Sequence, residues 1–154
     1  MKAKYPVSQR RTALKTGNNR IIVDTYAWIE YFSGTEIGEK VKKFLVEKYA
    51  YTPEIVLAEI ARKYIREGMS IETVKHRLYI IGELSVITGI DYKIALESGK
   101  AYLELLNHSK KLKLKTKPGL GDAIILATAK ILNAKILTGD QHFKNLKITI
   151  WLKD

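Results

Sequence analysis

Short, almost fully apolar segments that end at a polar residue constrain the fold of this chain more than any other feature. Residues 20–24 read Arg-Ile-Ile-Val-Asp, and residues 134–138 read Ala-Lys-Ile-Leu-Thr. Such runs are typical of the central strands of a parallel sheet, which are buried on both faces. Residues 148–151 predict a last strand, and very short strands are expected within residues 51–53 and 85–88.

Segments with the spacing of amphipathic helices separate these strands. Asp24, Ser70 and Asp91 have the chemistry of helix N-caps, and Gly34 is expected to end the first helix. Helices are predicted over residues 25–32, 36–48, 53–68, 70–84, 91–108 and 122–132. Strands that alternate with helices predict an α/β fold, here a three-layer α/β/α sandwich around a small central parallel sheet.

The positive charge of the chain is concentrated in two segments. The sequence holds 27 Lys and Arg against 16 Asp and Glu, a formal net charge of +11. Residues 1–20 contain six basic residues and no acid, residues 110–117 contain five Lys and no acid, and the remaining residues are balanced. A surplus of this size indicates a polyanionic partner, either a nucleic acid or an anionic membrane surface.

We expect residues 1–19 to form a basic, poorly ordered arm and residues 20–154 to form one folded domain. The alternative for the arm is a solubilising terminus without a partner, or a remnant of a cloning vector. Residues 110–117 are either an exposed edge strand protected by Lys or a loop that binds phosphates. The candidate RNA-binding residues are Lys110, Lys111, Lys113, Lys115, Lys117, Arg10 and Arg11.

Several classes of protein and site are excluded by composition. The absence of Cys excludes a disulfide scaffold, thiol catalysis and thiolate metal sites. His76, His108 and His142 share no short spacing, which argues against zinc, and each is interpreted as a surface or helix residue rather than a general base. No apolar run approaches the roughly 18 residues of a membrane span, and no signal peptide is evident, so we expect a soluble cytoplasmic protein.

Four acidic residues stand where a fold of this type builds ligand sites. Asp24 and Asp140 follow predicted strands, which places them at the carboxyl edge of the sheet. Asp122 begins a nearly all-apolar helix, and Glu59 has apolar neighbours on another helix. Taken singly, each has a structural explanation as a helix cap, a turn residue or, for Glu59, a surface partner of Arg62 or Lys63.

Taken together, the four acids predict a metal site. Converging carboxylates repel one another unless a divalent cation neutralises them, and hard oxygen donors without Cys or clustered His favour Mg²⁺ or Mn²⁺. An acidic site flanked by basic segments fits metal-assisted hydrolysis of a phosphodiester. The aromatic residues that follow the first acid are interpreted as packing or dimerisation residues rather than base-stacking ones: Tyr26, Trp28, Tyr31 and Phe32.

Four segments of the chain resemble the acidic motifs of PIN-domain nucleases. They are VDTYAWIEYF at residues 23–32, PEIVLAEIARKY at 53–64, GDAIILATAK at 121–130 and LTGDQHF at 137–143. Their order and spacing are also similar to that family, and the resemblance covers about residues 20–152. The small size and the Leu-Ala-Glu-Ile motif look most like VapC-type toxins of prokaryotic toxin–antitoxin pairs.

This resemblance implies a Mg²⁺- or Mn²⁺-dependent endoribonuclease that leaves a 5′-phosphate and a 3′-hydroxyl. It further implies a homodimer that is held inactive by an antitoxin whose arm occupies the acidic site. Asp24, Glu59, Asp122 and Asp140 match the metal-binding catalytic acids, and Thr138 matches a Thr/Ser position that hydrogen-bonds into the site. The basic arm and the Lys-rich run depart from the compact toxins.

Two other functions stay open at the level of sequence. One keeps the enzyme but assigns it to RNA processing or ribosome maturation. The other is a non-catalytic RNA-binding or assembly module that retains the acids for folding. The presence of all four acids argues against the second, because a decayed site is free to lose one.

Overall fold

The computed structural model describes residues 19–154, and these form one five-stranded sheet covered by helices. The strands are β1 (Arg20–Val23), β2 (Tyr49–Pro53), β3 (Val86–Thr88), β4 (Lys135–Thr138) and β5 (Thr149–Trp151). Their order in the sheet is β3-β2-β1-β4-β5, and every neighbouring pair is parallel. The predicted small parallel sheet is confirmed.

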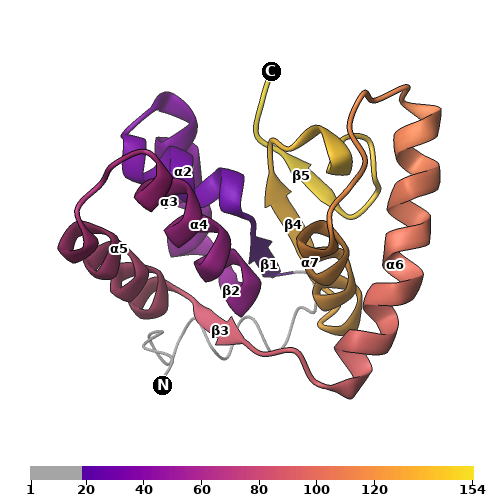
Figure 1. Cartoon of the computed structure of the whole chain (residues 1–154), viewed down its shortest axis with the longest axis horizontal. Helices are drawn as coiled ribbons and strands as arrows, with labels where there is room; N and C mark the ends of the chain where they lie inside the picture. The colour runs from indigo at the N-terminus through magenta and orange to yellow at the C-terminus, as the bar shows by residue number, and fades with distance from the viewer. Residues whose placement is uncertain (1–18) are drawn as a thin grey trace.

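The helices lie on both sides of this sheet. They are α2 (Thr25–Ser33), α3 (Glu36–Glu47), α4 (Glu54–Arg66), α5 (Ile71–Leu84), α6 (Tyr92–Lys111) and α7 (Leu120–Ile131), with a short 3₁₀ helix η1 (Gln141–Phe143) between β4 and β5. Figure 1 shows α2 to α5 grouped on one side of the strands and α6 with α7 on the other. The prediction of a three-layer α/β/α sandwich is therefore confirmed.

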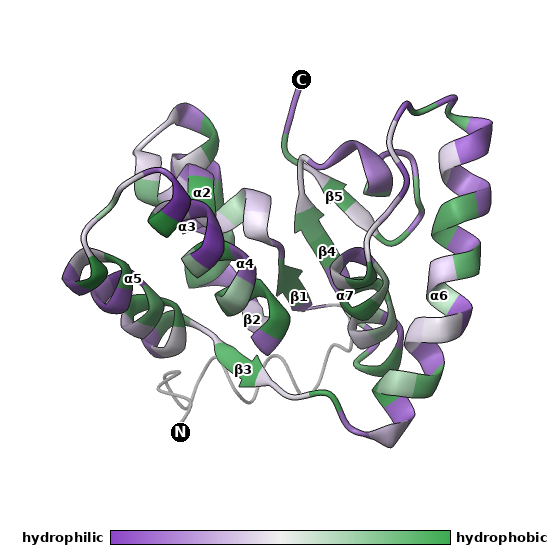
Figure 2. Ribbon diagram, viewed as in Figure 1, coloured by the Kyte–Doolittle hydropathy of each residue, from purple (hydrophilic) through white to green (hydrophobic). Residues whose placement is uncertain are grey.

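The core is built from the central strands and from α7. Ile21, Ile22 and Val23 of β1 are fully buried, because this strand is flanked by β2 and β4 and covered on both faces. Helix α7 is buried over seven consecutive residues, 123–129. Figure 2 shows hydrophobic residues gathered on β1, β4 and α7. Helix α7 is nearly all-apolar because it lies between the sheet and α6 and is buried there.

The aromatic residues of α2 pack as predicted. Trp28 is fully buried, and its indole N–H donates a hydrogen bond of 3.1 Å to the Thr52 hydroxyl. Its ring centroid lies 5.5 Å from that of Tyr31 and 6.1 Å from that of Phe32. Tyr26 instead lines a pocket at the end of the sheet.

The helix boundaries follow the predicted caps. The Asp24, Ser70 and Asp91 side chains accept backbone N–H bonds at the starts of α2, α5 and α6. Gly34 ends α2 at a φ of 67°, a left-handed conformation that costs glycine little.

Of the two alternatives for residues 110–117, an edge strand or a loop, the edge strand is wrong. Helix α6 continues beyond the predicted end at residue 108 to Lys111, where basic side chains complement the negative end of the helix dipole. Lys113 has a φ of 55°, and the Leu114 N–H bonds back to the Ser109 carbonyl. Backbone hydrogen bonds thus satisfy carbonyl groups at the end of α6. The residues that follow form a loop rather than pairing with a strand.

Two further predictions concern the basic arm and the absence of a membrane-spanning segment. Almost all of the predicted basic arm, including Arg10 and Arg11, lies outside the described residues. No helix of residues 19–154 is long and apolar enough to cross a membrane.

Candidate active site

The four predicted acids converge at the carboxyl edge of the sheet. Asp24 follows β1 and Asp140 follows β4, and these strands are hydrogen-bonded neighbours in the register Val23 to Leu137. Glu59 reaches the same place from α4, and Asp122 from the first turn of α7. All four line a pocket of about 350 Å³, together with Thr25, Tyr26, Ile29, Glu30 and Lys63.

Asp24 is the most deeply placed of the four acids, with 3% of its surface exposed. Its Oδ1 accepts a 2.7 Å bond from the Thr25 N–H, and its Oδ2 accepts a 2.6 Å bond from the Thr138 hydroxyl. Burial raises the pKa of Asp24 to about 8; the Thr138 bond opposes this shift, and the charges of Asp140 and Asp122 add to it.

Thr138 connects the first acid to the last. Its side chain is fully buried, and its Oγ accepts a 2.9 Å bond from the Asp140 N–H while its hydroxyl proton goes to Asp24. The hydrogen-bonding position expected for Thr138 from the family resemblance is therefore what the structure shows.

Glu59 is held by two neighbours from other elements. The Thr25 hydroxyl donates a 3.0 Å bond to its Oε1. A Cβ built on Gly121 would lie 3.0 Å from its Oε2, so the glycine lets the carboxylate rest against the start of α7. Burial raises the pKa of Glu59, and the charge of Asp122 raises it further. Lys63, one expected surface partner, bonds Glu67 at 2.6 Å instead.

Asp122 serves both as a helix residue and as a lining residue of the pocket. Helix α7 begins at Leu120 rather than at Asp122, with Gly119 as its N-cap. The Asp122 Oδ2 accepts a 2.8 Å bond from the Gly119 N–H, which closes the first turn. Burial raises the pKa of Asp122, against the effect of that bond.

His142 joins the last acid to the Lys-rich loop. Asp140 Oδ1 accepts a 2.9 Å bond from the His142 backbone N–H and lies 3.1 Å from its Nδ1. The other ring nitrogen, Nε2, lies 3.1 Å from the Thr116 carbonyl oxygen. His142 is only 8% exposed and lies in the 3₁₀ helix η1, so of its two interpretations, a surface or a helix residue, the structure supports the helix. The 3₁₀ turn η1 directs the ring inward, under the loop.

Sequence reasoning missed two residues that line this pocket. The sequence identifies Thr25 only as a helix residue, whereas in the structure its hydroxyl connects α2 to Glu59. Glu30 is a fifth acid in the pocket, and together with burial it raises the pKa of Tyr26. Tyr26 and Glu30 are four residues apart on one helix and so share a face, which is the signal that could have identified Glu30.

The donor chemistry of the pocket fits a hard divalent cation. All of its acids offer oxygen; burial raises the pKa values of three of them, and the charges of the neighbouring acids add to the shift. Over residues 19–154, no Lys or Arg forms an ion pair with these four acids. In the same part of the chain, no three acid or His side chains stand close enough to share one ion.

The five predicted lysines are all exposed. Lys110 and Lys111 lie in the last turn of α6, and Lys113, Lys115 and Lys117 lie in the loop that leads to α7. The contact between Thr116 and His142 fixes this loop beside Asp140. The structure thus brings residues 110–117 next to the acidic pocket, through the contact of Thr116 with His142 and of His142 with Asp140.

A family model described as the PIN domain matches residues 21–148. The chain belongs to the PIN-domain family. The match extends from β1 to the residue before β5 and includes all four acids. A search of curated protein sequences found no match.

Solved structures share the fold of this PIN-domain protein. A toxin–antitoxin complex from Klebsiella pneumoniae matches with a TM-score of 0.61 and 21% identity, over 87% of this chain and 98% of that one. VapBC2 from Rickettsia felis, bound to promoter DNA, matches with a TM-score of 0.60 and 19% identity, over 86% of this chain and 96% of that one. Mycobacterium tuberculosis VapC20, a sarcin-ricin-loop-cleaving toxin, matches with a TM-score of 0.60 and 17% identity, over 80% of this chain and 92% of that one.

Proposed function

We propose that this PIN-domain protein is a divalent-metal-dependent endoribonuclease. One observation carries the proposal: carboxylates from four separate elements converge in a single pocket at the carboxyl edge of the sheet. A fold that needed these acids only as caps has no reason to bury them together, since burial, and then the charges of the neighbouring acids, raise the pKa values of Asp24 and Glu59.

Asp24, Glu59, Asp122 and Asp140 are the residues that would hold Mg²⁺ or Mn²⁺ in this pocket. When bound, such a cation activates water and stabilises the charge that develops on a phosphate under attack. The chain's own hydroxyl groups position the donors: Thr138 orients Asp24, and Thr25 orients Glu59. The His142 backbone N–H orients Asp140 from the side of the loop, with the ring Nδ1 in contact with the same carboxylate oxygen.

The Lys-rich loop supports RNA as the substrate. It carries Lys113, Lys115 and Lys117, and it is fixed to the pocket through Thr116. Basic side chains at this position would neutralise the backbone phosphates on either side of the bond to be cut. Arg10 and Arg11, outside the described residues, would add to this attraction.

We further propose that the enzyme is the toxin of a VapBC-type pair and acts as a homodimer. The similar folds of the complexes from Klebsiella pneumoniae and Rickettsia felis support this role. A pocket with uncompensated acids is also a suitable receptor for a basic side chain from an antitoxin arm, which would block the binding of a cation.

Cleavage assays with matched variants test the nuclease proposal. The wild type should cut structured and unstructured RNA in Mn²⁺ or Mg²⁺ but not in EDTA, with 5′-phosphate ends. Asp24→Asn and Asp122→Asn should abolish cleavage and retain a cooperative thermal transition. Asp91→Asn is the control, because Asp91 also caps a helix but lies outside the pocket. Equal cleavage by all of these proteins would show that the activity is a contaminant.

Expression in a bacterial host tests the toxin role separately. The wild type should arrest growth, Asp122→Asn should not, and co-expression of a small protein encoded upstream should restore growth. An enzyme that cuts RNA in vitro without affecting growth belongs instead to RNA processing.

A further inference from the structure

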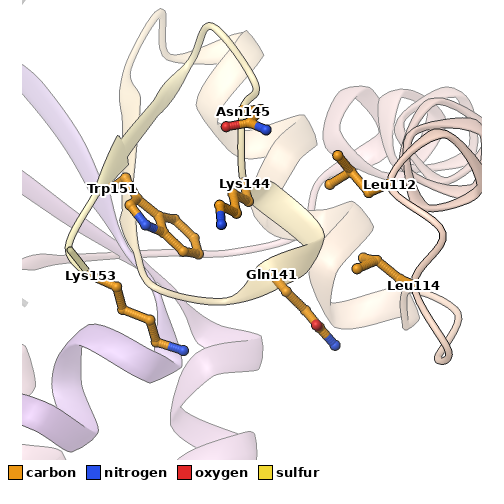
Figure 3. Close-up of a pocket in the computed structure, with 7 residues that line it drawn as sticks. All are labelled: Leu112, Leu114, Gln141, Lys144, Asn145, Trp151 and Lys153. Atoms are coloured by element: carbon orange, nitrogen blue, oxygen red, sulfur yellow. The ribbon is translucent and has the colours of Figure 1, made fainter.

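A second pocket lies beside the acidic one, between the loop after α6 and the C-terminal segment. Its volume is about 350 Å³, at the lower end of the roughly 300–1,000 Å³ range of small-ligand sites. Figure 3 shows Leu112 and Leu114 on one side of it and Trp151 with Lys144 on the other. The remaining lining residues are Gln141, Asn145 and Lys153.

The chemistry of this pocket combines an aromatic face with positive charge. Trp151 lies on β5, an edge strand, and is half-buried. The Lys144 Nζ is 5.6 Å from the centroid of the Trp151 ring, and the Lys153 Nζ is 6.0 Å from it. Among residues 19–154, no acidic residue lines the pocket. Aromatic faces next to basic side chains bind unpaired nucleobases by stacking and their phosphates by charge.

The two pockets lie next to each other on the chain. Gln141 follows Asp140 directly, so neighbouring residues line the acidic and the aromatic pocket. The Lys153 Nζ is 4.9 Å from the centroid of the Tyr26 ring, and Tyr26 lines the acidic pocket. A ligand that extends from Trp151 to the acids therefore passes over Lys153.

We propose that the pocket at Trp151 binds one unpaired base of an RNA strand, with the adjoining phosphates at Lys144 and Lys153 and the next phosphodiester at the acids. The inference rests on the proposed function and deepens it, because it names a substrate subsite for the same reaction. Stacking needs a base whose face is free, so the site selects single-stranded RNA over a duplex.

Tryptophan fluorescence tests the proposal on the unmodified protein. The chain has two tryptophans, and Trp28 is fully buried, so quenching by a ligand at the surface reports on Trp151. A short single-stranded oligoadenylate, added in EDTA to prevent cleavage, should quench the emission in a saturable manner. A duplex of the same length should quench it far less. Absence of quenching at oligonucleotide concentrations that saturate anisotropy would overturn the proposal.

Substitutions separate stacking from charge. Trp151→Leu keeps an apolar side chain without an aromatic face and should weaken oligoadenylate binding by roughly 5- to 150-fold, whereas Trp151→Phe should retain most of it. Lys144→Gln and Lys153→Gln should each lower the slope of log affinity against log salt by about 0.7.

Helix α5 offers a matched control pair for these variants. There Lys75 lies 6.0 Å from the centroid of the exposed Tyr79 ring, on the opposite side of the molecule from β5 (Figure 1). Lys75→Gln and Tyr79→Leu should leave binding unchanged. A Trp151→Leu protein that melts like the wild type and binds equally well refutes the subsite, as does an equal loss for single-stranded and duplex RNA.

The outcomes distinguish this inference from the nuclease proposal. Metal-dependent cleavage that is unaffected by Trp151→Leu would support the nuclease proposal and refute the subsite at Trp151. Quenching by single-stranded RNA without cleavage in any metal would support the subsite at Trp151 and refute the nuclease proposal.

Discussion

The Thr138 hydroxyl donates a 2.6 Å hydrogen bond to the Asp24 carboxylate across 114 residues of sequence. The same oxygen accepts the Asp140 N–H, so one buried side chain fixes two of the acids relative to each other. Because β1 and β4 are adjacent and parallel, the residues that follow them meet at one edge of the sheet.

Replacing Thr138 by Val should reduce cleavage roughly tenfold or more, because a bond to a charged group is worth about 1.5–3 kcal/mol and its loss leaves Asp24 free to turn. Thr138→Ser keeps the hydroxyl and should retain most of the activity. Measurement of kcat for both variants tests this role. Equal losses in the Val and Ser proteins would indicate a packing role for the methyl group instead.

The stability of the metal-free protein should fall as pH rises from about 4 to 8. Asp24 has a pKa of 3.8 when unfolded and about 8 in the fold, so the native state holds the extra proton over this range. The slope contributed by one such group is at most about 1.4 kcal/mol per pH unit. Denaturant titrations in EDTA at pH 5 and pH 8 measure it.

Asp24→Asn provides the control for this pH dependence, since the amide cannot ionise and the slope should flatten. Mg²⁺ should restore stability at pH 8, where the carboxylates are most readily ionised. Greater stability at pH 8 than at pH 5 without metal would contradict the assignment of a buried, uncompensated acid.

Gly121→Ala should lower activity without lowering stability. Its new Cβ would lie 3.0 Å from the Glu59 carboxylate and displace it, whereas alanine favours a helix by up to about 1 kcal/mol over glycine. We expect a loss of roughly tenfold in kcat. Gly99→Ala in α6 is the control, because no atom of the described residues 19–154 lies within 4 Å of its Cβ position. Unchanged activity in both variants would show that Glu59 need not rest on α7.

His142→Gln should loosen the Lys-rich loop from the acidic pocket. The variant loses the ring that spans Asp140 and Thr116, so trypsin should cut after Lys113 and Lys115 faster, and cleavage of RNA should fall. His76→Gln, at an exposed helix position, serves as the control. Identical proteolysis rates would show that other contacts hold the loop.

Deletion of residues 2–18 should weaken RNA binding and flatten its salt dependence, since it removes Arg10 and Arg11 among other basic residues. The cut spares Asn19, whose carbonyl accepts the Tyr49 N–H. Cleavage of saturating RNA should be unchanged. Anisotropy titrations at several salt concentrations measure the slope, and an unchanged slope would make this segment a bystander.

The apolar runs were sufficient to predict the parallel strands of the sheet and to place Asp24 and Asp140 at its carboxyl edge. Glu59 and Asp122 were identified from their helix positions and from the motifs around them. A strand buried on both faces requires an unbroken apolar run, and that requirement is visible locally, as at residues 21–23. The cap at Asp24 and the stop at Gly34 are likewise set within one turn of helix.

Only the tertiary structure decided how the polar groups are paired. The Lys-Leu alternation before Asp122 has the period of a strand, but the left-handed Lys113 and the bonds that close α6 make it a loop. His142 and Thr25 gain their roles from Thr116 and Glu59, which are distant in the sequence. Burial can be read from the local sequence, because apolar residues repeat along a helix or strand with its period. Hydrogen bonds between elements depend instead on how those elements pack.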